Sequence, residues 1–76
     1  MKNETRHPRK VYLHGKTVYL SKFRTLDTAI GAQGRSEKPA WIVLGDNDDR
    51  FGGFWLCRPV DAAKLERDGY EIVEYN

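Results

Sequence analysis

The pattern of residues 41–75 restricts the fold more than any other part of the chain. It reads as strand, turn, strand, short helix and strand. Pro59 or Asp61 opens the helix, and Gly69 ends it, because glycine readily takes the left-handed conformation found just beyond a helix end. Tyr70 would then contact the last helical turn. This half of the chain therefore predicts a helix between the strands of a small sheet.

Both faces of segment 41–44 are apolar, which is typical of a strand with neighbours on both sides. A turn at 45–50 leads to a second predicted strand at 51–57, where the glycine pair 52–53 permits a bulge or the close approach of another backbone. Residues 71–75 form the last predicted strand. A second apolar layer or a partner must cover one face of this sheet.

The first half begins with a predicted hairpin at residues 10–23. A two-residue turn at Gly15 and Lys16 is favoured, because glycine takes a positive φ at the first central position, and this register places Tyr12 opposite Tyr19. Since strand side chains alternate, one face is aliphatic and belongs to the core. That face holds Val11, Leu13, Val18 and Leu20.

The hairpin is followed by a predicted helix that Thr25 caps and that ends near Gly34. The polar segment 35–39 then leads into the second half. The predicted order is ββαββαβ, an α+β fold with a mainly antiparallel sheet and two short helices. Residues 1–9 are basic and carry almost no apolar side chains, so they predict a flexible tail before a single domain at 10–76.

Length and composition narrow the classes of function. A chain of 76 residues has a small core, which disfavours a deep enzymatic cleft. Its single cysteine, Cys57, excludes an internal disulfide, and the first residues lack the apolar stretch of a signal peptide. No apolar run approaches the roughly 20 residues that cross a bilayer. The expected location is the cytoplasm, without a membrane partner.

Charge is distributed unevenly along the chain. Residues 1–38 carry nine Lys or Arg against three Asp or Glu, whereas residues 39–76 carry four against eight. The first half can attract an anionic partner and the second a cationic one. The alternative is that both are ordinary solvated surfaces.

Neither a metal site nor a catalytic site is predicted. The acidic run 46–49 lacks the glycine and the twelfth-position glutamate of a calcium loop, so it is interpreted as a turn. His7, His14 and Cys57 are too few and too scattered for zinc. Cys57 is predicted to be a buried apolar residue, and no nucleophile motif or phosphate loop is present. We therefore expect no cofactor, no metal and no enzymatic activity.

Two surfaces are candidates for binding. The first is the outer face of the hairpin, where aromatic rings can stack on unpaired bases while cations contact phosphate. Its candidate residues are Lys10, Tyr12, Lys16, Tyr19, Lys22 and Arg24. The alternative interpretation is a tyrosine pair that only stabilises an exposed hairpin.

The second surface is an aromatic cluster that could bind a protein partner or a second copy of the chain. Its residues are Trp41, Phe51, Phe54 and Trp55. The alternative is that two short helices cover these side chains and make them ordinary core. The last strand could also pair edge to edge in a homodimer, although Glu71 and Glu74 oppose uncontrolled association.

Segments 39–46 and 54–71 combine a tryptophan-containing hairpin, a proline-initiated helix and a Gly-Tyr exit. In these features the chain resembles short proteins encoded by bacteriophages and other bacterial mobile elements, which form no named family. The resemblance implies binding to a host protein, including inhibition of host defence systems, and implies no catalytic or ligand residues. The leading hypothesis is thus a non-catalytic protein-binding domain, and the alternative is a nucleic-acid-binding module that uses the basic hairpin.

Overall fold

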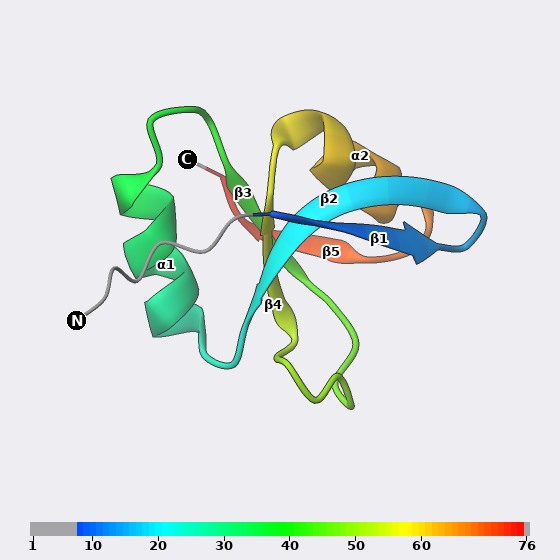
Figure 1. Cartoon of the computed structure of the whole chain (residues 1–76), viewed down its shortest axis with the longest axis horizontal. Coiled ribbons are helices and arrows are strands. Elements are labelled where there is room, and N and C mark those ends of the chain that lie inside the picture. The colour runs from blue at the N-terminus through cyan, green and yellow to red at the C-terminus, as the bar shows by residue number, and fades with distance from the viewer. Residues whose placement is uncertain (1–7, 76) are drawn as a thin grey trace.

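Five antiparallel strands form one sheet, and the chain order is ββαββαβ, as the sequence predicts (Figure 1). The structure is a computed structural model that describes residues 8–75. The sheet order is β1-β2-β4-β3-β5, and β1 and β5 are its edge strands. The elements are β1 (Arg9–Leu13), β2 (Lys16–Phe23), α1 (Leu26–Arg35), β3 (Trp41–Leu44), β4 (Phe54–Cys57), α2 (Pro59–Arg67) and β5 (Glu71–Glu74).

The central position predicted for residues 41–44 is confirmed, because β3 lies between β4 and β5. Its side chains alternate between two separate cores. Val43 packs with α2 residues on one face, and Ile42 packs with α1 residues on the other. Both side chains have no exposed surface. The two helices therefore supply the cover that both apolar faces of the sheet require.

Helix α1 begins where the sequence predicts. Thr25 is its N-cap, and the Thr28 amide donates to the Thr25 hydroxyl over 3.2 Å, which satisfies one of the free amides of the first turn. The helix continues one residue past Gly34, to Arg35. Ala29 is fully buried against Phe23 and Ile42 and forms the centre of the α1-side core.

Helix α2 begins at Pro59, and its end follows the predicted pattern closely. Gly69 has a φ of 101°. The Tyr70 amide donates to the Leu65 carbonyl over 3.1 Å, and the Gly69 amide donates to the Glu66 carbonyl over 3.0 Å. These two hydrogen bonds form a Schellman motif, which turns the chain into β5.

Trp55 is the largest fully buried side chain and lies in the α2-side core. Its indole N–H donates to the Gly52 carbonyl over 2.9 Å, so its one polar group is satisfied. Gly45 leaves the space that the indole ring fills, because a Cβ at that position would lie 2.2 Å from the ring. At Gly52 the backbone passes directly against Phe23, as the glycine pair predicts.

Tyr70 joins three segments at one end of the sheet. Its hydroxyl donates to the Asp46 carboxylate over 3.2 Å and lies 3.1 Å from the His14 Nε2. A hydroxyl has one proton to donate, so the His14 ring is the donor in the second hydrogen bond. Burial and the neighbouring Asp46 carboxylate raise the pKa of Tyr70.

The predicted register of the hairpin is wrong by one position in the turn. His14 and Gly15 are the central residues, with φ values of 50° and 78°, which are typical of a type I′ turn. Tyr12 therefore pairs with Thr17, and Lys10 pairs with Tyr19. The division of side chains between the two faces is unchanged, because the pairing partner shifts by two residues.

The predicted tail at 1–9 lies mostly outside the described residues. Arg9, however, belongs to β1 and pairs with Leu20. The ordered sheet therefore begins one residue before the predicted domain boundary.

Candidate nucleic-acid interface

Helix α1 leaves part of its face of the sheet uncovered, over β1 and the first half of β2. Here the side chains of Lys10, Tyr12, Thr17 and Tyr19 share one face, which we call the hairpin face. Tyr12 is 74% exposed and Tyr19 is 48% exposed. Lys10 stands directly opposite Tyr19 across the two strands. A cation and two aromatic rings are thus displayed side by side to solvent.

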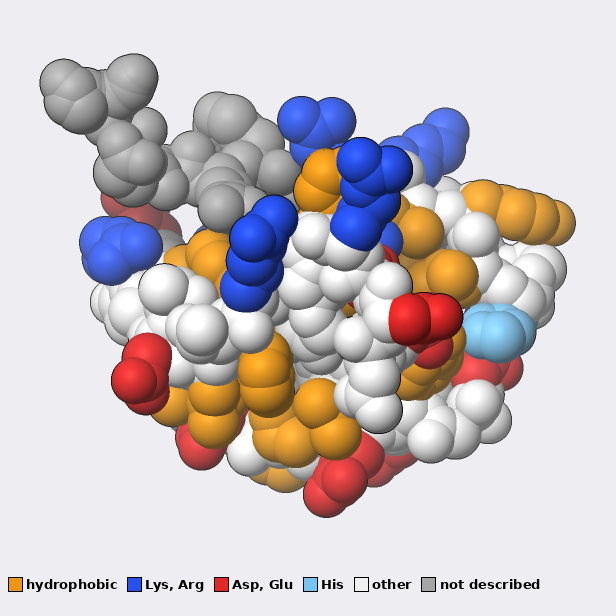
Figure 2. All heavy atoms as spheres, turned by 90° about the horizontal axis from the view of Figure 1, so that it is seen from below, with side chains coloured by type: hydrophobic (Ala, Val, Ile, Leu, Met, Phe, Trp, Pro, Cys, Tyr) orange, Lys and Arg blue, Asp and Glu red, His pale blue; other side chains and the backbone are white. Residues whose placement is uncertain are grey.

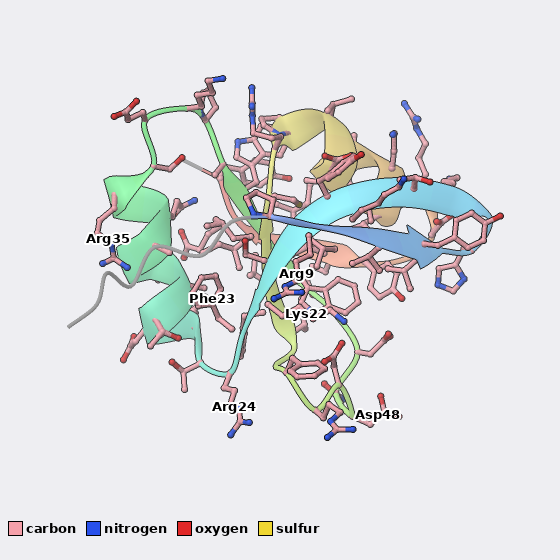
Figure 3. All side chains as sticks on the ribbon, viewed as in Figure 1. Arg9, Lys22, Phe23, Arg24, Arg35 and Asp48 are labelled. Carbon is pink, nitrogen blue, oxygen red and sulfur yellow. The ribbon has the colours of Figure 1, made fainter. Side chains whose placement is uncertain are left out.

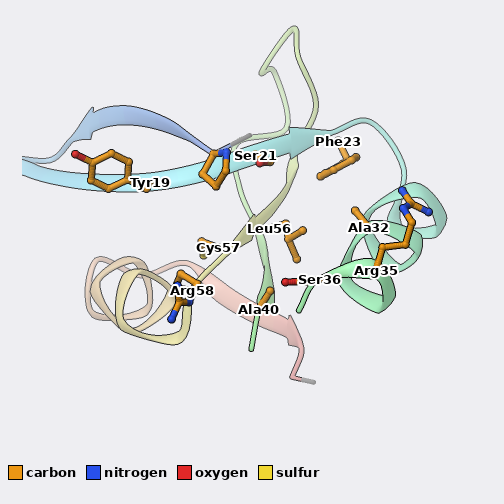
Figure 4. Close-up of a pocket in the computed structure, with 11 residues that line it drawn as sticks. Tyr19, Ser21, Phe23, Ala32, Arg35, Ser36, Ala40, Leu56, Cys57 and Arg58 are labelled. Atoms are coloured by element: carbon orange, nitrogen blue, oxygen red, sulfur yellow. The ribbon is translucent and has the colours of Figure 1, made fainter. Parts of the chain in front are cut away.

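A groove of about 190 Å³ begins at Tyr19 and runs between β2, the end of α1 and the start of α2 (Figure 4). Ser21, Phe23 and Leu56 in its lining point to the same side of the sheet as Tyr19, which makes the groove continuous with the hairpin face. The lining residues are Pro8, Tyr19, Ser21, Phe23, Ala32, Arg35, Ser36, Ala40, Leu56, Cys57 and Arg58.

The floor of the groove is apolar except for one hydroxyl. Phe23, Ala32 and Leu56 belong to the α1-side core. Ser21 lies among them and is 6% exposed. Within residues 8–75 its hydroxyl forms no hydrogen bond. Every fully buried side-chain polar atom among the described residues has a partner, so the Ser21 hydroxyl keeps accessible surface. Because Ser21 lines the groove, this hydroxyl is available to a ligand there.

The walls of the groove are cationic. Figure 4 shows Arg35 and Arg58 on opposite sides of it. Neither guanidinium forms an ion pair with a described carboxylate, and none of the described lining residues is Asp or Glu. The arrangement is therefore electrostatically suited to an anion with an apolar or aromatic part.

The face of the molecule seen in Figure 2 separates positive from negative side chains. In Figure 2, Lys and Arg side chains gather along the upper side of the view, and most Asp and Glu side chains lie along the lower side. This separation agrees with the uneven distribution of charge along the sequence.

The structure brings together only half of the residues predicted to contact nucleic acid. Lys10, Tyr12 and Tyr19 share the hairpin face. Lys16 and Lys22 point to the other face of the sheet. Lys16 pairs with Asp68 there over 3.0 Å.

Lys22 pairs with Asp49 and lies 5.3 Å from the centre of the Trp55 ring. Arg24 donates to the Arg50 carbonyl and lies at the opposite end of α1 from Arg35 (Figure 3). Both cations therefore support the β3–β4 loop rather than the hairpin face.

Sequence reasoning missed Ser21, Arg35 and Arg58. Strand alternation alone places Ser21 beside Tyr19 and Arg58 in line with Leu56. Their convergence depends on β2 pairing with β4, which the sequence does not reveal.

The four residues of the predicted protein interface do not form one surface. Trp55 is fully buried, so it is a core residue. Trp41 is half-buried and packs edge-on against Tyr75, with ring centres 4.7 Å apart. Phe54 packs against the α1-side core, and Phe51 is 60% exposed in the β3–β4 loop. The helices provide most of the cover that the sequence leaves open.

Cys57 and two carboxylates of the acidic run 46–49 interact with neighbouring groups in the fold. Cys57 is buried in the α2-side core, and burial with the nearby Asp61 raises its pKa to about 12. The thiol therefore stays protonated at neutral pH. In the acidic run, Asp49 accepts a hydrogen bond from the Phe51 amide, and Asp46 accepts one from Tyr70. Across the described ranges, no three His, Cys, Asp or Glu residues are grouped to hold a metal ion.

Comparison with protein-family models, curated proteins and solved structures gives no match for this chain. Neither helix in the described part of the chain is long and apolar enough to span a bilayer. Inference about function therefore depends on the site itself.

Proposed function

We propose that this protein binds single-stranded nucleic acid on the hairpin face and in the adjoining groove. The observation that carries the proposal is the continuity of two exposed tyrosine rings with a groove whose two arginines have no carboxylate partner among the described residues. Unpaired bases stack on aromatic rings exposed on a sheet, and guanidinium groups contact the phosphates. This function is the alternative that the sequence predicts.

The size and chemistry of the groove favour binding over catalysis. At about 190 Å³ it is smaller than the roughly 300 Å³ at which sites for drug-sized ligands begin. Its described lining offers no His, Asp or Glu as a general base, and the Cys57 thiol is protonated. Single-stranded nucleic acid and a lone cysteine both suit a cytoplasmic protein.

The test is fluorescence anisotropy with a labelled 12-nucleotide single strand, as DNA and as RNA, over a series of salt concentrations. We expect affinity to fall as salt rises, because phosphate contacts release counterions. The double variant Tyr12→Ala/Tyr19→Ala should lose at least tenfold in affinity, because each stacked base contributes about 1–3 kcal/mol.

The matched control for the tyrosine variants is Tyr75→Ala, which removes a ring of similar exposure beyond β5. Its affinity should stay within about twofold of the wild type. An equal loss in Tyr75→Ala, or no loss in the double variant, would contradict the proposal. A 12-base-pair duplex should bind more weakly than the single strand, because its bases are already stacked.

A second candidate function is binding of a protein partner beside β5, in line with the leading hypothesis from the sequence. One observation favours it: among the described strands β5 pairs only with β3, which leaves its other edge free, and the Trp41–Tyr75 aromatic pair lies at the end of β5. The resemblance to phage and mobile-element proteins would make that partner a host protein. Sedimentation equilibrium tests the homodimer form of this idea, and Tyr75→Asp should abolish any dimer.

A further inference from the structure

We infer that the groove holds one base of an internal nucleotide, and that Arg35 and Arg58 bind the phosphates on its two sides. This inference rests on the proposed function, because it divides the bound strand between the hairpin face and the groove. It assigns to the groove a ligand of stated chemistry: a nucleoside with phosphate at both its 3′ and 5′ positions.

The base is the part of a nucleotide that matches the groove floor. Phe23, Ala32 and Leu56 provide an apolar surface against which a flat ring can lie. The volume of about 190 Å³ admits one base and leaves the neighbouring bases for the tyrosine rings of the hairpin face. Tyr19 belongs to both surfaces, so it stands between the base in the groove and the next base of the strand.

Ser21 supplies the polar contact that a base requires. Ser21 is 6% exposed, and its hydroxyl forms no hydrogen bond with a described group and keeps accessible surface in the groove. A hydroxyl both donates and accepts, so it can hydrogen-bond to the edge of any of the bases. The groove is therefore selective for the presence of a base rather than for its identity.

The arginines distinguish an internal nucleotide from a mononucleotide. They stand on opposite sides of the groove, one from the last turn of α1 and one at the residue before α2 (Figure 4). A nucleotide inside a strand has one phosphate on each side of its sugar, whereas a mononucleotide has only one. Each arginine would therefore serve one phosphate, and both are engaged only by a strand or a bisphosphate.

The test uses NMR titration of the ¹⁵N-labelled full chain with thymidine 3′,5′-bisphosphate, with each thymidine monophosphate, and with abasic deoxyribose 3′,5′-bisphosphate. The bisphosphate should bind about tenfold more tightly than either monophosphate or the abasic compound. Ser21→Ala should weaken the bisphosphate about threefold or more and leave the abasic compound unchanged.

The arginine variants test which of the two phosphates each arginine binds. Arg35→Gln should remove the affinity for one monophosphate and spare the other, and Arg58→Gln should do the reverse. Arg67→Gln is the matched control, because Arg67 lies in the last turn of α2, outside the groove lining. Equal losses of both monophosphates in each variant would overturn the assignment of one phosphate to each arginine.

The outcomes separate this inference from the proposed function. If the 12-nucleotide strand binds with its dependence on Tyr12 and Tyr19, but the groove variants behave as Arg67→Gln does, the inference is wrong and the proposed function stands. If the strand does not bind the wild-type protein, the proposed function itself is wrong.

Discussion

The two faces of the sheet are built from the same strands, but one is closed and the other is half open. On the α2 side, Trp55, Leu20 and Val43 are buried almost completely. On the α1 side, Tyr12 and Tyr19 remain exposed beside a groove. One short helix covers only part of each face, so the strand side chains determine whether the rest of that face is buried. Large apolar residues close a face, whereas tyrosine, serine and lysine leave it available for binding.

Helix length alone does not explain the difference. Helix α1 has 10 residues and spans about 15 Å, whereas a five-stranded sheet is about 19 Å wide. Helix α2 is shorter still, with 9 residues. In addition to the apolar strand side chains that close the α2 side, α2 and its C-cap contact the hairpin: Lys64 donates to the Thr17 carbonyl over 3.3 Å, and Asp68 accepts from Lys16 over 3.0 Å.

The largest expected contrast comes from truncating one aromatic residue on each face. Trp55→Ala should lower the free energy of unfolding by about 3–5 kcal/mol, because it removes the largest buried side chain and leaves a cavity. Tyr19→Ala should cost less than about 1 kcal/mol, because that ring is half exposed. Urea denaturation measures both. Equal losses would mean that the α1 side is packed as tightly as the α2 side.

The next effect probes the space that the tryptophan ring occupies. Gly45→Ala places a methyl group 2.2 Å from the Trp55 ring, which must move. We expect a loss of about 1–3 kcal/mol in the free energy of unfolding and a changed tryptophan fluorescence. Thermal unfolding checks the first, and an unchanged melting temperature would contradict the close packing of ring and loop.

A smaller effect depends on pH. Burial alone raises the pKa of Asp49, but hydrogen bonds from Lys22 and from the Phe51 and Gly52 amides outweigh it, and the net pKa lies below the ordinary 3.8. A lowered folded-state pKa stabilises the protein above the ordinary value, and this stabilisation is lost as pH falls through the folded value. Asp49→Asn should cost about 1 kcal/mol at neutral pH and flatten the acid limb of the stability curve.

The control for the pH prediction is Asp48→Asn, in the same loop, where the described residues provide no ion pair. Denaturation from pH 7 down to the acid limit should leave the shape of its curve unchanged. A curve for Asp49→Asn that runs parallel to the wild type would show that the Lys22 pair does not hold the loop.

The smallest expected effect is a gain. Gly34→Ala adds a methyl group with no atom within 4 Å, at a helix position without a positive φ. The variant should raise the free energy of unfolding by about 0.5–1 kcal/mol, because alanine loses less backbone entropy than glycine in a helix. Differential scanning calorimetry measures the rise. It should leave nucleic-acid affinity unchanged, because Gly34 is outside the groove lining.

Local rules account for the parts of the fold that the sequence predicts correctly. The end of α2 follows from one glycine and the two residues beside it, and Thr25 caps α1 through its own hydroxyl. The hairpin turn is different, because it places His14, a residue with a Cβ, at a positive φ. Residues with a Cβ are uncommon at a positive φ, although histidine is enriched there. Sequence reasoning therefore places Gly15 at the first central position of the turn, which gives the wrong register.

Local sequence rules do not predict the groove. Ser21, Arg35 and Arg58 come from β2, α1 and the residue before α2, and they meet because β2 pairs with β4. Pairing between strands more than thirty residues apart is decided by the packing of the whole core. The predicted aromatic protein interface is wrong for the same reason, since only the tertiary structure shows that Trp55 is covered.

Tyr70 gives the molecule a connection between its two sequence ends. The hydrogen bond from His14 to Tyr70 spans 56 residues, so it can form only after most of the chain is in place. Amide hydrogens at the hairpin tip should then exchange with solvent slowly only while the exit of α2 is docked, and Tyr70→Phe should speed their exchange without melting either helix. Opening at the far end of the sequence would be transmitted to the strand pair that carries the hairpin face.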